Sequence, residues 1–328
     1  MQKLRTYLIP HARRAAKTLV LILLALDFAT PCRAEPRSEL VQRKARALCT
    51  FLLGNTEYSG AAIEVADPRQ VRQVAGQPWP TGLSPVWHVP VRIATLGQGY
   101  FMFETSPEGE LHEFTLDLPS LFPPQEGAQI GRVPNFQQFQ IPGKQHPTTA
   151  SGCVPTAAAC LVAHWAAVAI KDWGESALDD PSEILRKITL RLRSKMRMQE
   201  IADTSGYTDD GTALSGTFPE ELANALRGDA QEHQANVRVE LTKFDSKKLR
   251  EEIGSARPVL VSCVVRLPHK PQLSWGHEVV AVGWQSIENR CYVGVRDNFF
   301  PIQNQSTLRW IREEMFNSMI TVAPSQTQ

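Results

Sequence analysis

Hydrophobic positions change their spacing part-way along the chain, from about 3.6 residues to about 2. A strongly apolar stretch predicts a helix over residues 155–169. Helical spacing predicts three more helices at 181–198, 217–226 and 245–253. Apolar runs with many β-branched residues then predict strands at 258–265, 277–284, 290–297 and 319–322. Helices grouped before an antiparallel sheet indicate an α+β fold.

Cap and turn residues predict where these helices begin and end. Pro155 suits the first turn of a helix, where no N–H partner is needed. Thr217 followed by Glu220 has the pattern of a capping box, with Gly228 just past the helix end. Gly254 closes the predicted helix at 245–253.

The N-terminal third predicts a smaller α+β unit. Apolar positions recur with helical spacing from Ser38, a possible cap, to Gly54, a possible stop. Strands are expected at 87–93, 100–104 and 111–116, and the turn at 106–109 joins the last two as a hairpin.

A Pro/Gly/Gln-rich stretch separates this unit from the rest of the chain. We therefore expect an N-terminal accessory or propeptide-like domain at 35–120, a linker or extended arm at 121–145 and a main domain at 146–328. Before them, five basic residues precede the apolar run 19–26, and Cys32-Arg33-Ala34 places small residues at a cleavage point. This pattern predicts a signal peptide at 1–34 and an exported protein, periplasmic or extracellular, with no membrane association after cleavage.

Charge and cysteine content narrow the possible partners. The chain has 328 residues, of which 35 are basic and 34 acidic, so its net charge of +1 gives no reason to expect binding to nucleic acid. The oligomeric state is left open. Six cysteines become five once Cys32 is removed with the signal, and the odd number indicates a free thiol. Cys263 and Cys291 lie in predicted strands and are candidates for a disulfide.

The free thiol that carries chemistry is expected to be Cys153, in the segment Ser-Gly-Cys-Val-Pro-Thr-Ala-Ala-Ala at 151–159. Its position at the start of a long helix favours the thiolate, because unpaired N–H groups and the helix dipole lie there. Gly152 lets the backbone pass tightly before the helix and leaves room for a substrate carbonyl. The N–H of Cys153 can then point at a developing oxyanion. A packing or disulfide-bonded cysteine is the alternative interpretation.

His277 and Asp297 are the expected partners of this thiol. His277 follows Gly276 at the start of an apolar strand, and histidine titrates close to working pH. Asp297 ends the next strand, and a turn at 286–289 brings it back beside His277. A carboxylate there can accept from Nδ1–H and leave Nε2 facing the thiol. Asn298 is the alternative orienting residue.

A side-chain donor to the oxyanion is expected shortly before the nucleophile. Gln145, eight residues upstream of Cys153, is our choice, and Gln138 and Gln140 are rivals. The remaining histidines have no metal-ligand spacing, and there is no glycine-rich phosphate loop. No metal and no cofactor are therefore expected.

These motifs, together with Gly-His-Glu-Val-Val-Ala-Val-Gly at 276–283 and Val-Arg-Asp at 295–297, resemble the papain-fold peptidases related to bacteriocin-processing peptidases. The resemblance covers about residues 133–300. It implies a papain-like fold, a triad of Cys153, His277 and Asp297, and a glutamine before the cysteine in the oxyanion hole. The loose spacing of that glutamine and Val154, where the family often has glycine, are departures. The helix and hairpin at 35–120 also resemble propeptide domains of some bacterial cysteine peptidases, and a permanent accessory domain is the alternative.

The function expected from these residues is hydrolysis of peptide bonds in a peptide or protein substrate, through a thioester acyl-enzyme. An acyltransferase or transglutaminase-like enzyme would use the same triad, with an amine in place of water. A non-catalytic papain-fold binding module is the third possibility.

Overall fold

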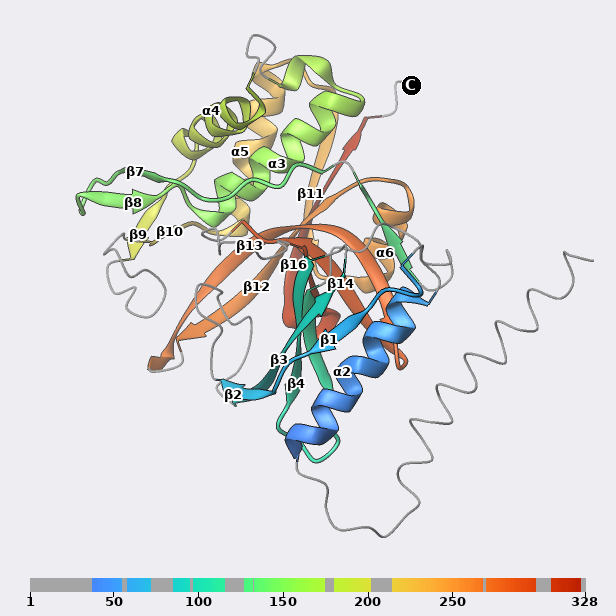
Figure 1. Ribbon diagram of the computed structural model, residues 1–328. Coiled ribbons are helices and arrows are strands. Elements are labelled where there is room, and N and C mark those ends of the chain that lie inside the picture. The colour runs from blue at the N-terminus through green and yellow to red at the C-terminus, as the bar shows by residue number, and fades with distance from the viewer. Residues whose placement is uncertain are drawn as a thin grey trace, which may run out of the picture.

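One large antiparallel sheet with helices packed against it gives the protein an α+β architecture, as predicted (Figure 1). The computed structural model describes residues 37–54, 58–71, 85–94, 97–115, 127–131, 133–174, 180–201, 214–267, 270–298 and 308–325. The predicted signal peptide at 1–34 lies outside the described residues.

The sheet has 12 strands among the described residues, and ten of them follow the order β1-β3-β4-β5-β15-β14-β13-β12-β16-β11. Their bounds are β1 (Ile63–Val65), β3 (Val86–Ile93), β4 (Gly97–Glu104), β5 (Leu111–Thr115), β11 (Val237–Lys243), β12 (Val259–Leu267), β13 (Lys270–Ile287), β14 (Arg290–Arg296), β15 (Leu308–Arg312) and β16 (Phe316–Pro324). The other two strands are short and lie outside this order. Strand β2 (Arg69–Val71) pairs with β3, and β6 (Gly127–Gln129) pairs with β13. Two hairpins lie apart from this sheet: β7 (Gln140–Pro142) with β8 (Thr148–Ala150), and β9 (Gln199–Ile201) with β10 (Leu214–Gly216).

Five α-helices lie in the described part of the chain: α2 (Arg37–Leu53), α3 (Cys153–Val168), α4 (Pro181–Ser194), α5 (Pro219–Glu232) and α6 (Ser246–Gly254). Short 3-10 turns occur at Lys171–Trp173 and Glu313–Met315. In Figure 1, α3, α4 and α5 gather at one end of the sheet, whereas α2 lies beside β1 and β3. The buried, almost wholly apolar helix α3 packs on β12 and β13, and β13 contains the predicted histidine.

Most predicted helices and strands are present, and the errors have local causes. Helix α5 begins at Pro219, not Thr217, because the proline takes the first helical position. The Thr217 hydroxyl donates to the Arg197 carbonyl instead of capping the helix, and Gly228 lies inside the helix. The predicted helix at 181–198 ends earlier, at Ser194. Strands β11 and β15 were not predicted from the sequence.

The N-terminal strands and the C-terminal strands form a single sheet. Strand β5 pairs with β15 in antiparallel register, with Phe114 opposite Trp310 and Glu113 opposite Ile311. Part of the segment that we expected to be a linker is strand β6, which pairs with β13. The two regions expected to be separate domains therefore share backbone hydrogen bonds and a hydrophobic core.

The proposed disulfide between Cys263 and Cys291 is wrong. Both are free, buried thiols, as are the other three cysteines among the described residues. Cys263 is in β12 and Cys291 in β14, with β13 between them. Cys263 is opposite His277 and Cys291 is opposite Ser286, nine residues further along β13. At about 3.3 Å per residue the two are about 30 Å apart along the strand, far beyond the roughly 7 Å that a disulfide allows between Cα atoms.

The Trp310 ring covers a pair of glycines on the neighbouring strands. Gly283 and Gly294 are opposite each other in β13 and β14, and Trp310 is opposite Gly294 in β15. A Cβ at Gly294 would lie 2.9 Å from the indole, and one at Gly283 would lie 3.0 Å from it. The fully buried indole can lie flat on the sheet only because both residues lack a side chain.

Gly294→Ala is therefore expected to lower the free energy of unfolding by about 1–3 kcal/mol through overpacking against Trp310. Gly228→Ala is the matched control, because a Cβ there meets nothing within 4 Å in the interior of α5. The control should raise stability by about 0.5–1 kcal/mol, since alanine is the better helix former. Denaturant unfolding measures both changes, and equal effects would contradict this account of the glycine pair.

Candidate active site

Cys153 is the first residue of helix α3, directly after the helix cap Gly152. The first N–H groups of a helix have no partner within it, so they point out of its N-terminus around this residue. Gly152 has φ +97°, and a Cβ there would lie 2.8 Å from the Met198 side chain. Glycine is required here by backbone conformation and by this close approach, and Cys153 itself is only 7% exposed.

The residues before Cys153 are held by polar contacts from several elements. Ser151 N–H donates to the Phe139 carbonyl, and the Ser151 hydroxyl accepts from Phe139 N–H. Arg193, from α4, donates to the Ser151 carbonyl at 2.8 Å and to the Ser215 hydroxyl at 2.8 Å. These bonds fix the backbone that enters the helix, and with it the position of the Cys153 side chain.

His277 and Asp297 meet beside this helix terminus, on adjacent strands of the sheet. The His277 imidazole lies on β13, with Nε2 3.0 Å from Asp297 Oδ1. Asp297 follows the last residue of β14, and its neighbour Arg296 pairs with Val280. The turn between the strands has positive φ at Glu288 (50°) and Asn289 (62°), as a tight two-residue hairpin requires.

The three predicted residues form one buried, charge-coupled group. Burial alone would lower the pKa of His277, but the charge and hydrogen bond of Asp297, together with the hydrogen bond and charge of Cys153, raise this pKa to about 10. Burial alone would raise the pKa of Asp297, but Arg309 and His277 outweigh it and lower this pKa. The structure thus favours an imidazolium beside a carboxylate, which is the state that stabilises a neighbouring thiolate.

The roles of the two ring nitrogens are the reverse of those predicted. Asp297 binds Nε2, so Nδ1 is the nitrogen left for the thiol. The sequence shows that the two residues are neighbours, but the ring orientation depends on the side-chain rotamer of His277 in the folded protein.

Asn298, the alternative orienting residue, has a different place. Its Nδ2 donates to the Cys153 carbonyl at 2.9 Å and to the Glu278 carbonyl at 3.0 Å, thereby joining the helix to β13. Gln138 is buried beside it, with Nε2 3.3 Å from Asn298 Oδ1 and its N–H bonded to the Asn298 carbonyl. Asn298 thus connects this glutamine to the backbone of Cys153.

The structure does not place Gln145 with the other three predicted residues. Gln145 is exposed in the turn between β7 and β8, where its N–H donates to the Glu200 carboxylate. The hairpin register pairs Gln140 with Ala150, and its continuation brings residues 137 and 138, not 145, alongside 152 and 153. Spacing along the chain is misleading here, because the intervening residues turn back on themselves.

Three buried polar residues behind the site were missed. Arg309 of β15 bridges Asp297 and Glu113, and Glu113 accepts a hydrogen bond from Tyr100. Arg309 reads as a solvent-facing residue in the sequence Leu-Arg-Trp-Ile-Arg, yet all five residues are buried. No local pattern distinguishes a buried arginine from an exposed one, because its carboxylate partners come from distant strands.

Neither a metal-binding cluster in the described residues nor a match to a family model or curated protein accompanies this geometry. No group of three or more His, Cys, Asp or Glu residues suited to a metal occurs in the described ranges. Among the same residues, no helix is both long and apolar enough to cross a bilayer. No family model matches the sequence, and no curated protein does.

Glu278 is a second buried carboxyl group next to the imidazole in sequence. One oxygen accepts from the Ser262 hydroxyl, whereas Oε1 has no hydrogen-bond partner among the described residues. Burial raises the pKa of Glu278 to about 7, although the Ser262 bond and the charge of His277 oppose the rise. Its proton therefore comes off in the neutral range.

Because the folded-state pKa of Glu278 exceeds its value in an unfolded chain, the native protein is expected to lose stability as pH rises from about 4.5 through about 7. Glu278→Gln should remove roughly 2–4 kcal/mol of this pH dependence, leaving the variant more stable than wild type at about pH 8. Denaturant unfolding at several pH values measures the difference. Glu251→Gln changes an exposed carboxylate and is the control; the same slope in both variants would contradict the prediction.

Proposed function

We propose that this protein is a cysteine peptidase with a papain-like arrangement, in which a helix-borne thiol meets a sheet-borne imidazole. The observation that carries the proposal is the position of the His277 ring, which has Cys153 and Asp297 as hydrogen-bond partners. A nucleophile, a base and a group that orients the base are the minimum for thiol-based acyl transfer.

In the proposed reaction, the Cys153 sulfur attacks the carbonyl carbon of a peptide bond. The new C–S bond gives a tetrahedral oxyanion, and the C–N bond breaks as the His277 imidazolium transfers its proton to the leaving amine. Neutral His277 then takes a proton from water as the water oxygen attacks the thioester carbon. The C–S bond breaks, which releases the carboxylic acid and restores the Cys153 thiolate beside the His277 imidazolium. Asp297 holds the ring through both steps.

The oxyanion would form at the N-terminus of α3, where the Cys153 N–H is available as a donor. Gln138 is our proposal for the side-chain donor, in place of Gln145. It is buried, it lies on the segment that runs alongside residues 152 and 153, and Asn298 connects it to the Cys153 carbonyl. The exposed position of Gln145 at a hairpin tip argues against that residue.

The proposed substrate is a peptide or protein outside the cytoplasm. The resemblance to bacteriocin-processing peptidases supports hydrolysis as the reaction class, and the signal-like N-terminal sequence supports export. The net charge of +1 is compatible with a peptide substrate and gives no reason to expect a polyanionic one.

Iodoacetamide is expected to alkylate Cys153 faster than any other described thiol. Burial raises the pKa of Cys49, Cys160 and Cys291 to about 12 and that of Cys263 further still, so these thiols are poor nucleophiles. His277→Ala should slow alkylation of Cys153 at least about tenfold near pH 7, since the thiolate loses its cation. Peptide mapping by mass spectrometry measures each site.

Cys160→Ala is the control, because it removes a buried thiol on the same helix and should leave labelling of Cys153 unchanged. Equal labelling of all thiols, or fast labelling that survives His277→Ala, would overturn the proposed mechanism. The same wild-type sample, incubated with a peptide library with and without added amines, distinguishes hydrolysis from acyl transfer by the products.

Replacing the two glutamines distinguishes the oxyanion donors. Gln138→Ala is expected to lower kcat on a peptide substrate by about 100-fold, with KM less affected, because its donor acts mainly in the transition state. Gln145→Ala should leave both parameters within about twofold of wild type, as an exposed turn residue would. The opposite order would return the role to Gln145.

A further inference from the structure

A chain of buried polar side chains extends from the candidate triad into the N-terminal part of the sheet. Asp297 Oδ1 accepts from His277, and Oδ2 accepts from Arg309 Nη1. The other side of the guanidinium faces Glu113, with Nη2 2.8 Å from Oε2 and Nε 3.3 Å from Oε1. The Tyr100 hydroxyl donates to Glu113 Oε1 at 2.7 Å. His277 and Tyr100 are thus the two ends of one continuous hydrogen-bonded chain.

Four members of this hydrogen-bonded chain lie in strands β13, β15, β5 and β4, and Asp297 directly follows β14. Arg309 pairs with Thr115 across β15 and β5, and Glu113 pairs with Met102 across β5 and β4. Tyr100 and Glu113 both belong to the region that the sequence assigned to an accessory or propeptide-like domain. That region therefore contributes side chains to the surroundings of Asp297.

Burial makes the members depend on one another. Arg309 is 2% exposed and Glu113 is fully buried, so neither charge is hydrated. With Asp297 and Glu113 negative, and Arg309 and protonated His277 positive, the four charges sum to zero. Removing one member would leave an uncompensated charge in the interior, which is strongly unfavourable. Arg309 satisfies both carboxylates with a rigid planar fork, a geometry that lysine cannot provide.

We propose, resting on the function above, that Arg309, Glu113 and Tyr100 are positioning residues for Asp297 and thereby for the His277 ring, so that β4 and β5 are a permanent part of the active enzyme. The guanidinium fixes the direction of the Asp297 carboxylate, which has to present one oxygen to Nε2. Glu113 fixes the guanidinium, and the Tyr100 hydroxyl fixes one oxygen of Glu113. A cleavable propeptide would not supply these contacts to the mature enzyme.

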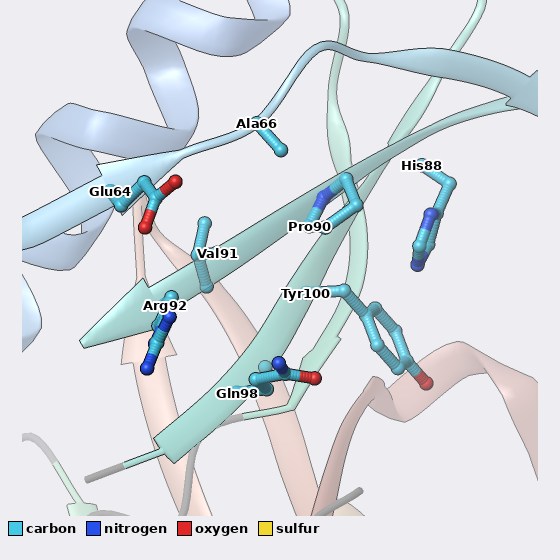
Figure 2. Close-up of a pocket in the computed structure, with 9 residues that line it drawn as sticks. Glu64, Ala66, His88, Pro90, Val91, Arg92, Gln98 and Tyr100 are labelled. Atoms are coloured by element: carbon cyan, nitrogen blue, oxygen red, sulfur yellow. The ribbon is translucent and has the colours of Figure 1, made fainter. Parts of the chain in front are cut away.

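Figure 2 shows the outer end of the chain, where the Tyr100 ring lines a cavity of about 360 Å³ together with His88, Arg92 and Gln98. The ring centroids of His88 and Tyr100 are 5.1 Å apart. Tyr100→Phe would keep the aromatic wall of this cavity and remove the hydroxyl that donates to Glu113. Gln98 lines the same cavity from β4, but its side chain is exposed and makes no hydrogen bond to any member of the hydrogen-bonded chain. It is therefore a matched control.

The test uses the full-length protein and three variants, Glu113→Gln, Tyr100→Phe and Arg309→Lys. Each is compared with the control variant Gln98→Ala. The readouts are the pH profile of Cys153 alkylation, kcat and KM on a peptide substrate, and the NMR signal of the His277 ring N–H, identified by its loss in His277→Ala. Denaturant unfolding shows that each variant is folded. A merely structural role would lower stability without moving the pH profile or the ring signal of the folded protein.

We expect Glu113→Gln to lower kcat at least about tenfold, with KM nearly unchanged, and to shift the high-pH limb of the alkylation profile to lower pH. Tyr100→Phe should lower kcat and shift the alkylation profile in the same direction, by a smaller factor. Arg309→Lys should not preserve the wild-type pH profile of alkylation, because lysine lacks the planar fork. Gln98→Ala should match wild type throughout.

Wild-type profiles and ring signals in folded Glu113→Gln and Tyr100→Phe would overturn the positioning role. Should Glu113→Gln fail to fold, Tyr100→Phe and Glu113→Asp decide, because both keep the interior charge balanced. Failure of the proposed function is separate: it is seen as slow alkylation of Cys153 in the wild type. In that event the ring signal still tests whether the chain orients His277, and an unchanged signal in all variants would overturn the inference.

Discussion

The buried Asp297 carboxylate is the constraint on which the candidate site depends. Its charge is unfavourable in the interior unless cations are held against both oxygens. His277 occupies one oxygen and Arg309 the other, and each comes from a different strand. The position of the imidazole is therefore set by the register of β13, β14 and β15, not by the residues next to it in sequence.

Two kinds of secondary structure would contribute different parts of the proposed chemistry. The N-terminus of α3 offers unpaired N–H groups and a favourable dipole for Cys153, while the sheet offers a rigid frame for His277, the proposed base, and for Asp297. Asn298 joins the two parts, since its amide donates both to Cys153 on the helix and to Glu278 on β13. A site built at such a junction requires accurate docking of the helix on the sheet, and the buried alanines of α3 permit the close approach.

The N-terminal region is an integral part of the main sheet and not a separate domain. As a sequence it is a helix and a hairpin, which are compatible with a removable domain. In the structure, Phe114 and Trp310 pair across β5 and β15, and their rings stack 5.9 Å apart. Glu113, on the adjacent position, accepts from Arg309. Backbone pairing, core packing and an ion pair thus connect the region to the rest of the chain.

The sequence by itself determined the features with short-range causes. Helical and strand-like periods predicted the α+β class and most of the helices and strands. The position of Cys153 at a helix start, and the hairpin that returns Asp297 to His277, are also local, so the placement of these three candidate residues could be predicted without coordinates. Errors arose where two local signals competed. Thr217 and Glu220 predicted a capping box, but Pro219 sets the start of the helix.

Only the tertiary structure decided the rest, because the deciding partners are far apart in the chain. The sequence led us to choose Gln145 over Gln138, whereas the fold buries Gln138 and exposes Gln145. Cys263 and Cys291 were candidates for a bond until the strand order placed β13 between them. Arg309 reads as a surface residue until Asp297 and Glu113 are brought to it from 12 and 196 residues away. Burial of charge is a property of the assembled core, and no window of sequence contains it.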